Sequence, residues 1–455
     1  MDSVGDISMK ISKSVILSIS IAAMLIVTFQ YAYGLSFANR VQLSDTDEMS
    51  IDPLVGAESR NVYVLWNDGC FIDENDNIVC NDISFRRSAD SGATFDDVIH
   101  LRIDNNEGTS GSPSLAESEN NVYASWFDSS EGNMEIFFAA SNNHGESFDD
   151  IMNLSGNEGN SIGEPSMAAS GDNNAYVAWT DETPGNSDVL FRASHDGGES
   201  FDDTMNLSGN EGSANISDGL VASGDDDIYA VWTDDTEGNQ EIFFRASHDG
   251  GESFDDIMNL SEIGGQSFIP LMAAFEETVY VTWFEVVGPC NNLLRISHDG
   301  GESFGEPICL DDFGISGVIE VAAVSDEKFH VIGFGQIEGV SDVLLMRSND
   351  GGENLKVVGL EIGSGVNFPQ VAISGNRIFF AWEDLSSGDE FLKVSTDGGK
   401  TFGPIINITD EGIVGAFSGQ SVEMVLEANR AYFVWSDSST GNNEVFFGAA
   451  GMARK

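Results

Sequence analysis

The sequence predicts an all-β protein, an eight-bladed β-propeller of four-stranded antiparallel blades, with seven blades as the alternative. An eight-residue phrase, best preserved as Ser194 to Phe201, recurs seven times between Ser88 and Phe402 at intervals of 47 to 53 residues. Short runs rich in β-branched and aromatic residues recur with it, separated by clusters of Gly, Asn and Asp that are typical of turns. Repeats of this length that contain strands are typical of sheets arranged radially around an axis.

The first 34 residues differ from the repeats and have the features of a secretory signal. Lys10 and Lys13 precede an apolar stretch over residues 15–29, and Ala32 and Gly34 are small residues where a signal peptidase cuts. We expect cleavage after Gly34. The alternative is an uncleaved anchor, because the apolar core can be extended toward the ~20 residues of a spanning helix. We expect no membrane insertion beyond this segment.

One repeat, residues 164–208, shows the expected blade most clearly. Its four strand candidates are residues 165–169, 175–179, 189–193 and 205–207. The second strand marks the repeats best, because in seven of them it ends in tryptophan: Trp66, Trp126, Trp179, Trp232, Trp283, Trp382 and Trp435. An eighth repeat has Gly333 at this place, so the chain contains eight second strands.

Residues 35–455 are expected to form a single propeller domain whose two ends meet. The last repeat stops after its third strand, Val445 to Phe447, whereas the segment from Ser36 to Ser44 has the pattern of a fourth strand. We expect the N-terminal strand to complete the last blade, because this closes the ring and leaves no sheet edge open.

The composition is strongly acidic and excludes one class of partner. The 455 residues include 76 Asp and Glu but 19 Lys and Arg, which gives a formal charge of −57 and a pI near 4.1. Nucleic acid is not expected as a partner, because its phosphates are held by Lys and Arg. Cations and positively charged partners are favoured instead. Adaptation to a salty medium is the alternative reason for the acidity.

Cysteines and glycosylation sequons agree with export. Cys70 pairs with Cys80 and Cys290 with Cys309 in our prediction, since an even count in an exported chain indicates local disulfides. Five sequons begin at Asn153, Asn206, Asn215, Asn259 and Asn407. Three of these belong to a recurring Asn-Leu-Ser strand end, so their recurrence also has a structural explanation. We expect the protein to be secreted or held at the cell surface.

The recurring phrase resembles the Asp-box, or BNR repeat, written Ser-x-Asp-x-Gly-x-x-Trp or Phe, of sialidase-like propellers. The resemblance covers essentially all of residues 35–455. Its third position is occupied by Asp90, Asn143, Asp196, Asp249, Asp299, Asp350 and Asp397. The family implies turns between third and fourth strands, away from the site face. A structural role also follows from the residues, since Asp196 can accept hydrogen bonds from turn amides and Phe201 can fill the groove between blades.

The resemblance raises a sialidase hypothesis, which requires three arginines for the substrate carboxylate, a tyrosine nucleophile with a glutamate, and an aspartate acid/base. We place five arginines at one equivalent position of the third strand, as parts of the repeat: Arg86, Arg192, Arg245, Arg295 and Arg347. Each tyrosine after residue 34 stands three residues before a repeat tryptophan, so none is an exception to the repeat. We therefore assign no catalytic residues, and enzymatic activity is uncertain with the balance against it.

A ring of carboxylates is the candidate ligand face. Acids stand two residues after tryptophan in seven repeats: Asp68, Asp128, Asp181, Asp234, Glu285, Asp384 and Asp437. Others begin the third strand across the same hairpin. The pairs that are candidate calcium ligands are Asp128 with Glu135, Asp181 with Asp188, Asp234 with Glu241, and Asp437 with Glu444. Structural capping of turns by these acids is the alternative.

We therefore expect an exported, monomeric β-propeller that acts as a binding or surface-interaction module for a glycan or a cell-surface protein, assisted by Ca²⁺. Two other classes remain open. One is a glycoside hydrolase of the sialidase-like type, and the other is a structural component of the cell envelope.

Overall fold

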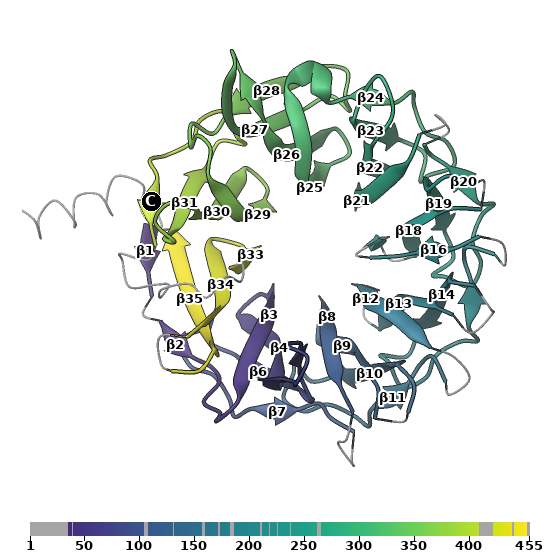
Figure 1. Ribbon diagram of the computed structural model, residues 1–455, viewed down its shortest axis with the longest axis vertical. Coiled ribbons are helices and arrows are strands. Elements are labelled where there is room, and N and C mark those ends of the chain that lie inside the picture. Colours follow the sequence, from purple (N-terminus) through teal and green to yellow (C-terminus); the bar gives the residue numbers. More distant parts are fainter. Residues whose placement is uncertain are drawn as a thin grey trace, which may run out of the picture.

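The computed structural model contains an eight-bladed β-propeller, as predicted, in which the blades surround a central axis (Figure 1). The structure describes residues 35–38, 40–103, 108–130, 132–156, 160–171, 173–182, 186–209, 212–217, 219–224, 226–236, 238–261, 265–408, 422–438 and 441–452. The predicted export signal, residues 1–34, lies outside this part of the chain. No helix within the described ranges is long and apolar enough to cross a membrane.

The first four blades follow the chain from the axis outward. Blade 1 contains β3 (Met49–Glu58), β4 (Asn61–Ile72), β6 (Asp82–Ser88) and β7 (Ile99–His100), with β5 (Ile78–Val79) against β4. Blade 2 contains β8 (Ser110–Ser118), β9 (Asn121–Asp128), β10 (Glu135–Ser141) and β11 (Met152–Asn153). Blade 3 contains β12 (Ser161–Ser170), β13 (Asn174–Asp181), β14 (Asp188–Ser194) and β15 (Met205–Asn206). Blade 4 contains β16 (Ala214–Asn215), β17 (Leu220–Ser223), β18 (Asp227–Asp234), β19 (Glu241–Ser247) and β20 (Met258–Asn259).

The other four blades repeat this order. Blade 5 contains β21 (Ser267–Phe275), β22 (Thr278–Glu285), β23 (Asn292–Ser297) and β24 (Ile308–Cys309), followed by the 3-10 helix η1 (Asp311–Phe313). Blade 6 contains β25 (Ile315–Ser325), β26 (Lys328–Ile337), β27 (Val340–Ser348) and β28 (Lys356–Gly359). Blade 7 contains β29 (Val366–Ser374), β30 (Arg377–Asp384), β31 (Glu390–Ser395) and β32 (Ile406–Asn407). Blade 8 contains β33 (Glu423–Glu427), β34 (Arg430–Asp437), β35 (Glu444–Met452), β1 (Leu35–Phe37) and β2 (Val41–Gln42).

The expected closure of the ring is confirmed. In β1, Ser36 pairs with Gly451, and in β2, Val41 pairs with Phe447, so the N-terminal segment supplies the outer strand of blade 8. Figure 1 shows this purple segment against the yellow β35. Between them, Arg40 lies 3.6 Å from the centroid of the Phe446 ring and donates to Asp437 at 3.1 Å. Blade 8 therefore joins the first and the last described segments of the chain.

The hydrophobic core lies in the interfaces between neighbouring blades. Each second strand is covered on both faces, as in β13, where residues 175 to 181 are all buried. This explains why the second strands are continuous apolar runs rather than alternating ones. The repeat tryptophans are almost fully buried, and Trp179 packs with Ile136 of blade 2 and Val177 of blade 3. Since each blade needs its neighbours to cover these runs, the blades stabilise one another around the ring.

The two ends of every blade differ, and they define two faces of the molecule. The second and third strands join at the loop face, where Asp181 lies opposite Asp188 in blade 3. The opposite end is the box face, where Ala175 pairs with Ser194 and the recurring phrase begins. Both predicted disulfides are confirmed, Cys70 with Cys80 and Cys290 with Cys309. Each one restrains loops near the loop face of its blade.

Candidate functional site

The ring of acids lies at the loop face, but its carboxylates are inside the blades. Six of the seven predicted residues are buried, with exposed fractions of 3% or less, and Asp384 is half-buried. Serines at the start of the first strand donate to four of them: Ser50 to Asp68 at 2.7 Å, Ser110 to Asp128 at 2.5 Å, Ser161 to Asp181 at 2.9 Å, and Ser267 to Glu285 at 2.6 Å. These carboxylates therefore tie the innermost strand to the second strand.

The other three acids of the ring are bound by different groups. Asp234 accepts from the backbone N–H of Thr236 at 2.7 Å, and Asp384 accepts from that of Ser386 at 3.0 Å. Asp437 forms the ion pair with Arg40. The side chains of the whole ring thus have partners within the protein, which is what a turn-capping role requires.

The cross-strand pairs expected from the sequence are present. Asp128 lies opposite Glu135, Asp181 opposite Asp188, Asp234 opposite Glu241, and Asp437 opposite Glu444. The second member of a pair often binds the outermost strand, since Asn206 donates to Asp188 at 2.8 Å and Ser155 donates to Glu135 at 2.5 Å. The two acids of a hairpin therefore connect all four strands of their blade.

Two members of this second row were not predicted from the sequence. Asp82 lies opposite Asp68 and contacts His100 at 2.7 Å, and Asp389 accepts from Asn407 at 3.1 Å. Neither follows a Gly-Asn pair, which precedes Glu241 in blade 4. A search for an acid 18 residues before the Asn, or His, of the fourth strand would have found them, because Asp188 and Asn206 have the same spacing.

These contacts also bear on the sequons. Asn206 and Asn407 use their side-chain amides inside the blade, and Asn259 donates to Glu241. Their recurrence therefore has the structural reason that we gave as the alternative. Asn215 in β16 is exposed.

Burial dominates the electrostatics of the acid pairs. Desolvation raises the pKa of Asp188, and the charges of Asp234 and Asp181 add to this effect. Burial, and then the neighbouring Glu383, raise the pKa of Glu390 to about 8. A group with a raised pKa is stabilised by a proton or a bound cation. Among the described residues, the one group of three possible metal ligands within 4.8 Å of one another is Cys290, Cys309 and Asp311, and both of its cysteines are in a disulfide.

The recurring phrase folds into the same hydrogen-bonded turn at the box face. In blade 3, Asp196 accepts from the N–H of Ser200 at 2.9 Å, and Ser194 Oγ accepts from the N–H of Gly198 at 3.0 Å. The oxygen of Asn143 makes the equivalent contact with Ser147 at 3.1 Å. Equivalent contacts are made at Asp90, Asp249, Asp299, Asp350 and Asp397.

The aromatic residue that ends the phrase packs across the groove to the preceding blade. Phe201 meets Phe138 edge to face with ring centroids 4.8 Å apart, and Phe254 meets Phe191 at 5.0 Å. The phrase therefore fastens its own hairpin and joins neighbouring blades.

Three of the five repeat arginines, Arg86, Arg192 and Arg245, donate to backbone carbonyls, and Arg347 was placed wrongly from the sequence. Arg192 donates to the carbonyls of Asp202 at 2.7 Å and Leu154 at 3.1 Å, and Arg245 makes the equivalent bonds. Arg347 does not share their position. It pairs with His330, so it lies one residue further along its strand than Arg295, which pairs with Val281. Side chains alternate between the two faces of a strand, so Arg347 points to the opposite face.

A cavity of 520 Å³ opens at the loop face between blades 5 and 6, where the sequence analysis had assigned only Glu285. It is lined by Phe284, Asn291, Asn292, Asp311, Gly314, Ile315, Ser316 and Gln336. Asp311 accepts from the N–H of Asn291 and from the side-chain amide of Asn292, both at 2.7 Å. The segments beside the cavity expose Phe313 and Phe334 by 37% and 39%. The signal in the sequence was the pair of asparagines beside Cys290.

No protein-family model matches the chain, and no curated protein sequence matches it. Similar solved structures are sialidase-like and other β-propeller proteins. A Hadza microbial sialidase, Hz136, is 11% identical over 81% of this chain and 73% of its own, with a TM-score of 0.42. The β-propeller domain of the Trilobed protease from Pyrococcus furiosus is 12% identical over 73% and 93%, with a TM-score of 0.46. The polysaccharide lyase Uly1 is 11% identical over 88% and 89%, with a TM-score of 0.49. These similarities concern the fold.

Proposed function

We propose that the protein is an exported propeller that binds glycans in the loop-face cavity between blades 5 and 6. The observation that carries the proposal is the chemistry of this cavity. The ring of Phe284 provides an apolar face for the C–H groups of a sugar, while Asn291 and Gln336 provide donors and acceptors for its hydroxyls. Its volume lies in the range of small-molecule sites.

Preorganisation of the cavity supports binding. Asp311 holds both asparagines, and the Asn291 side chain also donates to the carbonyl of Glu285 at 2.7 Å. The disulfide between Cys290 and Cys309 restrains the loops on both sides of Asp311. Side chains that are held before a ligand arrives lose little freedom on binding.

Binding fits these residues better than glycoside hydrolysis. Hydrolysis by the usual two-carboxylate mechanism needs a pair of acids that flank the substrate. The described residues of the cavity wall include a single carboxylate, Asp311, and it is already hydrogen-bonded to two asparagines.

We propose the extracellular space as the location and a monomer as the working form. The two disulfides support the location, because such bonds persist in oxidising compartments. The export signal at residues 1–34 belongs to the same proposal. Assistance by Ca²⁺ at the buried acid pairs also stays a proposal, supported by the raised pKa of Asp188.

A glycan array followed by calorimetric titration with the best oligosaccharide tests the function. We expect Phe284→Ala and Gln336→Ala each to weaken binding by about tenfold, in line with the loss of one aromatic or polar contact. Phe275→Ala is the matched control, because this half-exposed phenylalanine ends β21 at the box face, away from the cavity. A protein that binds no glycan, or whose Phe284 variant binds as the parent does, contradicts the proposal.

A further inference from the structure

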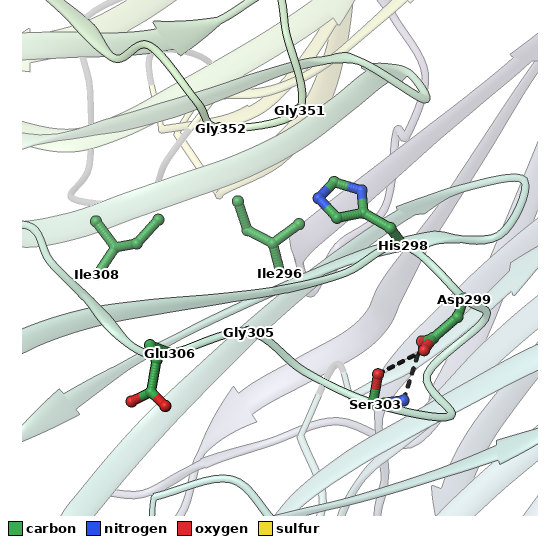
Figure 2. A pocket seen from close by; sticks show the side chains of 9 residues that line it. All are labelled: Ile296, His298, Asp299, Ser303, Gly305, Glu306, Ile308, Gly351 and Gly352. Carbon is green, nitrogen blue, oxygen red and sulfur yellow. Dashed lines mark hydrogen bonds between the residues drawn. The ribbon is translucent and has the colours of Figure 1, made fainter.

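Two adjacent grooves of the box face, between blades 5 and 6 and between blades 6 and 7, differ in charge. Figure 2 shows the groove between blades 5 and 6, a cavity of 280 Å³. Ile296 and Ile308 supply apolar surface, Glu306 supplies a carboxylate, and Asp299 is turned toward Ser303, to which it is hydrogen-bonded. His298 adds an imidazole, and the described residues that line this groove include neither lysine nor arginine.

The next groove, between blades 6 and 7, is basic. It encloses 460 Å³ and is lined by Val324, Lys328, His330, Arg347, Asn349, Gly375, Asn376, Thr396, Asp397, Gly398 and Lys400. Three of the 19 basic side chains of a chain with 76 acids therefore meet in one cavity. We name it the basic groove.

Each basic residue of this groove stands where the preceding repeat has a neutral or acidic residue. The strand registers make Lys328 equivalent to Thr278, His330 to Tyr280, and Arg347 to Ile296. Lys400 is equivalent to Glu353 in the recurring phrase, and five of the six other copies have glutamate there. Arginine also stands at the place of Arg347 in blade 1, where Arg87 pairs with Glu146, but Lys400 occupies the place of that glutamate here. The four residues together add cations and an imidazole to one cavity, a combination that copying of the repeat does not explain.

The cations of the basic groove are not neutralised within the protein. In the described part of the chain, no ion pair involves Lys328, Arg347 or Lys400, and Arg347 Nε is buried without a hydrogen-bond partner. Asp397 is the one carboxylate among the described wall residues, and its oxygens accept from Ser395 and Thr401 in the box turn. A buried donor without a partner is costly, and an oxyanion would satisfy it.

His330 adds a hydrogen-bond acceptor to these donors. Its side chain is 5% exposed, and a hydrogen bond joins it to the backbone of Gly398. The N–H of Gly398 already donates to Asn376, so the imidazole donates to the Gly398 carbonyl. Because Nδ1 has no partner, this bond uses Nε2 and leaves the Nδ1 lone pair free. Burial, together with the charge of Arg347, lowers the pKa of His330 to about 4, so the ring is neutral at pH 7.

We propose that the basic groove binds a small anionic ligand that carries a hydroxyl group near its charged group, such as a sugar acid. Arg347, Lys328 and Lys400 hold the carboxylate or sulfate, and the hydroxyl donates to His330 Nδ1. The site lies on the box face and is separate from the loop-face cavity. Anion binding here therefore does not depend on glycan binding at the proposed glycan site.

Calorimetric titration with D-glucuronate, D-glucose and inorganic sulfate tests this site. We expect the protein to bind glucuronate, to bind sulfate more weakly because it lacks the hydroxyl contact, and not to bind glucose. Arg347→Ile and Lys400→Glu introduce the residues of neighbouring repeats, which the fold accepts at the same positions. Each is expected to weaken glucuronate binding by about tenfold or more, the effect of one lost charged contact.

Two further variants make the test specific. Arg102→Ser removes an exposed positive charge beside β7 of blade 1, away from the groove, and should leave glucuronate binding unchanged. His330→Tyr introduces the tyrosine of six other blades and should bring glucuronate affinity down to that of sulfate. No glucuronate binding by the parent protein at millimolar concentration overturns the proposal, as does equal binding by the Arg347 and Arg102 variants. Equal affinity for glucuronate and sulfate in the parent overturns the role of His330.

Discussion

Blades 3 and 6 share a topology but differ at the positions that define the repeat. Blade 3 has Tyr176, Trp179 and Phe201, while blade 6 has His330, Gly333 and Leu355 at the equivalent places. A cavity of 430 Å³ between blades 3 and 4 is lined by the acids Asp202, Asp203 and Glu252, whereas the loop-face cavity and the basic groove both border blade 6. The comparison teaches that the repeated residues build the scaffold and that the chemistry collects where the repeat is broken.

Gly333 shows how the break is accommodated. A Cβ atom at this position would lie 2.5 Å from the carbonyl oxygen of Gly317 in the innermost strand. That strand is irregular, with shifts of register between Ile315 and Gly317 and between Val318 and Glu320. The tryptophan of the other blades therefore has no room here, and the inner strand approaches the second strand instead.

The largest effect should come from removing the scaffold of blade 3. We expect Trp179→Ala to lower the free energy of unfolding by about 3–5 kcal/mol, because a fully buried ring between blades 2 and 3 is lost. Denaturant unfolding followed by circular dichroism measures the change. A loss below about 1 kcal/mol would contradict a scaffold role for the repeat tryptophan.

Blade 7 extends the comparison to the buried acids. The pKa of Glu390 is raised to about 8 in the folded protein, so the folded state holds a proton that the unfolded state releases near pH 4.5. Stability from this group is therefore lost as the pH rises from about 5 to 8. We expect Glu390→Gln to remove this loss. Its free energy of unfolding at pH 8 should exceed that of the parent by on the order of 3 kcal/mol. Parallel pH–stability curves for parent and variant would contradict this account.

Two substitutions of Asp196, with smaller expected effects on stability, separate the hydrogen bonds of the box turn from the charge of the carboxylate. We expect Asp196→Ala to cost about 1–2 kcal/mol of stability, because the N–H of Ser200 and the hydroxyls of Ser194 and Ser200 lose their acceptor. Asp196→Asn should cost less than about 0.5 kcal/mol, since Asn143 supports the same turn in blade 2. Thermal unfolding of both variants decides between hydrogen bonding and charge as the cause.

The smallest expected effect concerns calcium. Addition of Ca²⁺ should raise the melting temperature by a few degrees at most, because binding stabilises the folded state in proportion to the logarithm of its saturation. Asp188→Asn should reduce this rise, while Asp350→Asn on the box face should not. An unchanged melting temperature together with no heat of binding in calorimetry would remove the calcium hypothesis.

The sequence by itself determined the number of blades, the closing strand and both disulfides. The blades and the closing strand follow from strand patterns that recur in the repeats. The disulfides follow from two pairs of cysteines that lie close together in the sequence. It also located the paired acids, although it missed Asp82 and Asp389, whose preceding residues differ from the other copies.

Only the tertiary structure decided which of these residues face solvent and which departures from the repeat meet. It showed that six of the seven acids of the ring are buried, because their carboxylates accept hydrogen bonds at the ends of strands in their own blades. It also moved Arg347 by one residue relative to the repeat arginines and so placed it beside His330. A shift of one residue exchanges the two faces of a strand. The offset itself can be counted in the sequence, because Arg347 directly precedes Ser348 whereas Arg295 stands two residues before Ser297. Only the folded sheet shows that the exchanged face lines the basic groove, because the groove is formed between two blades.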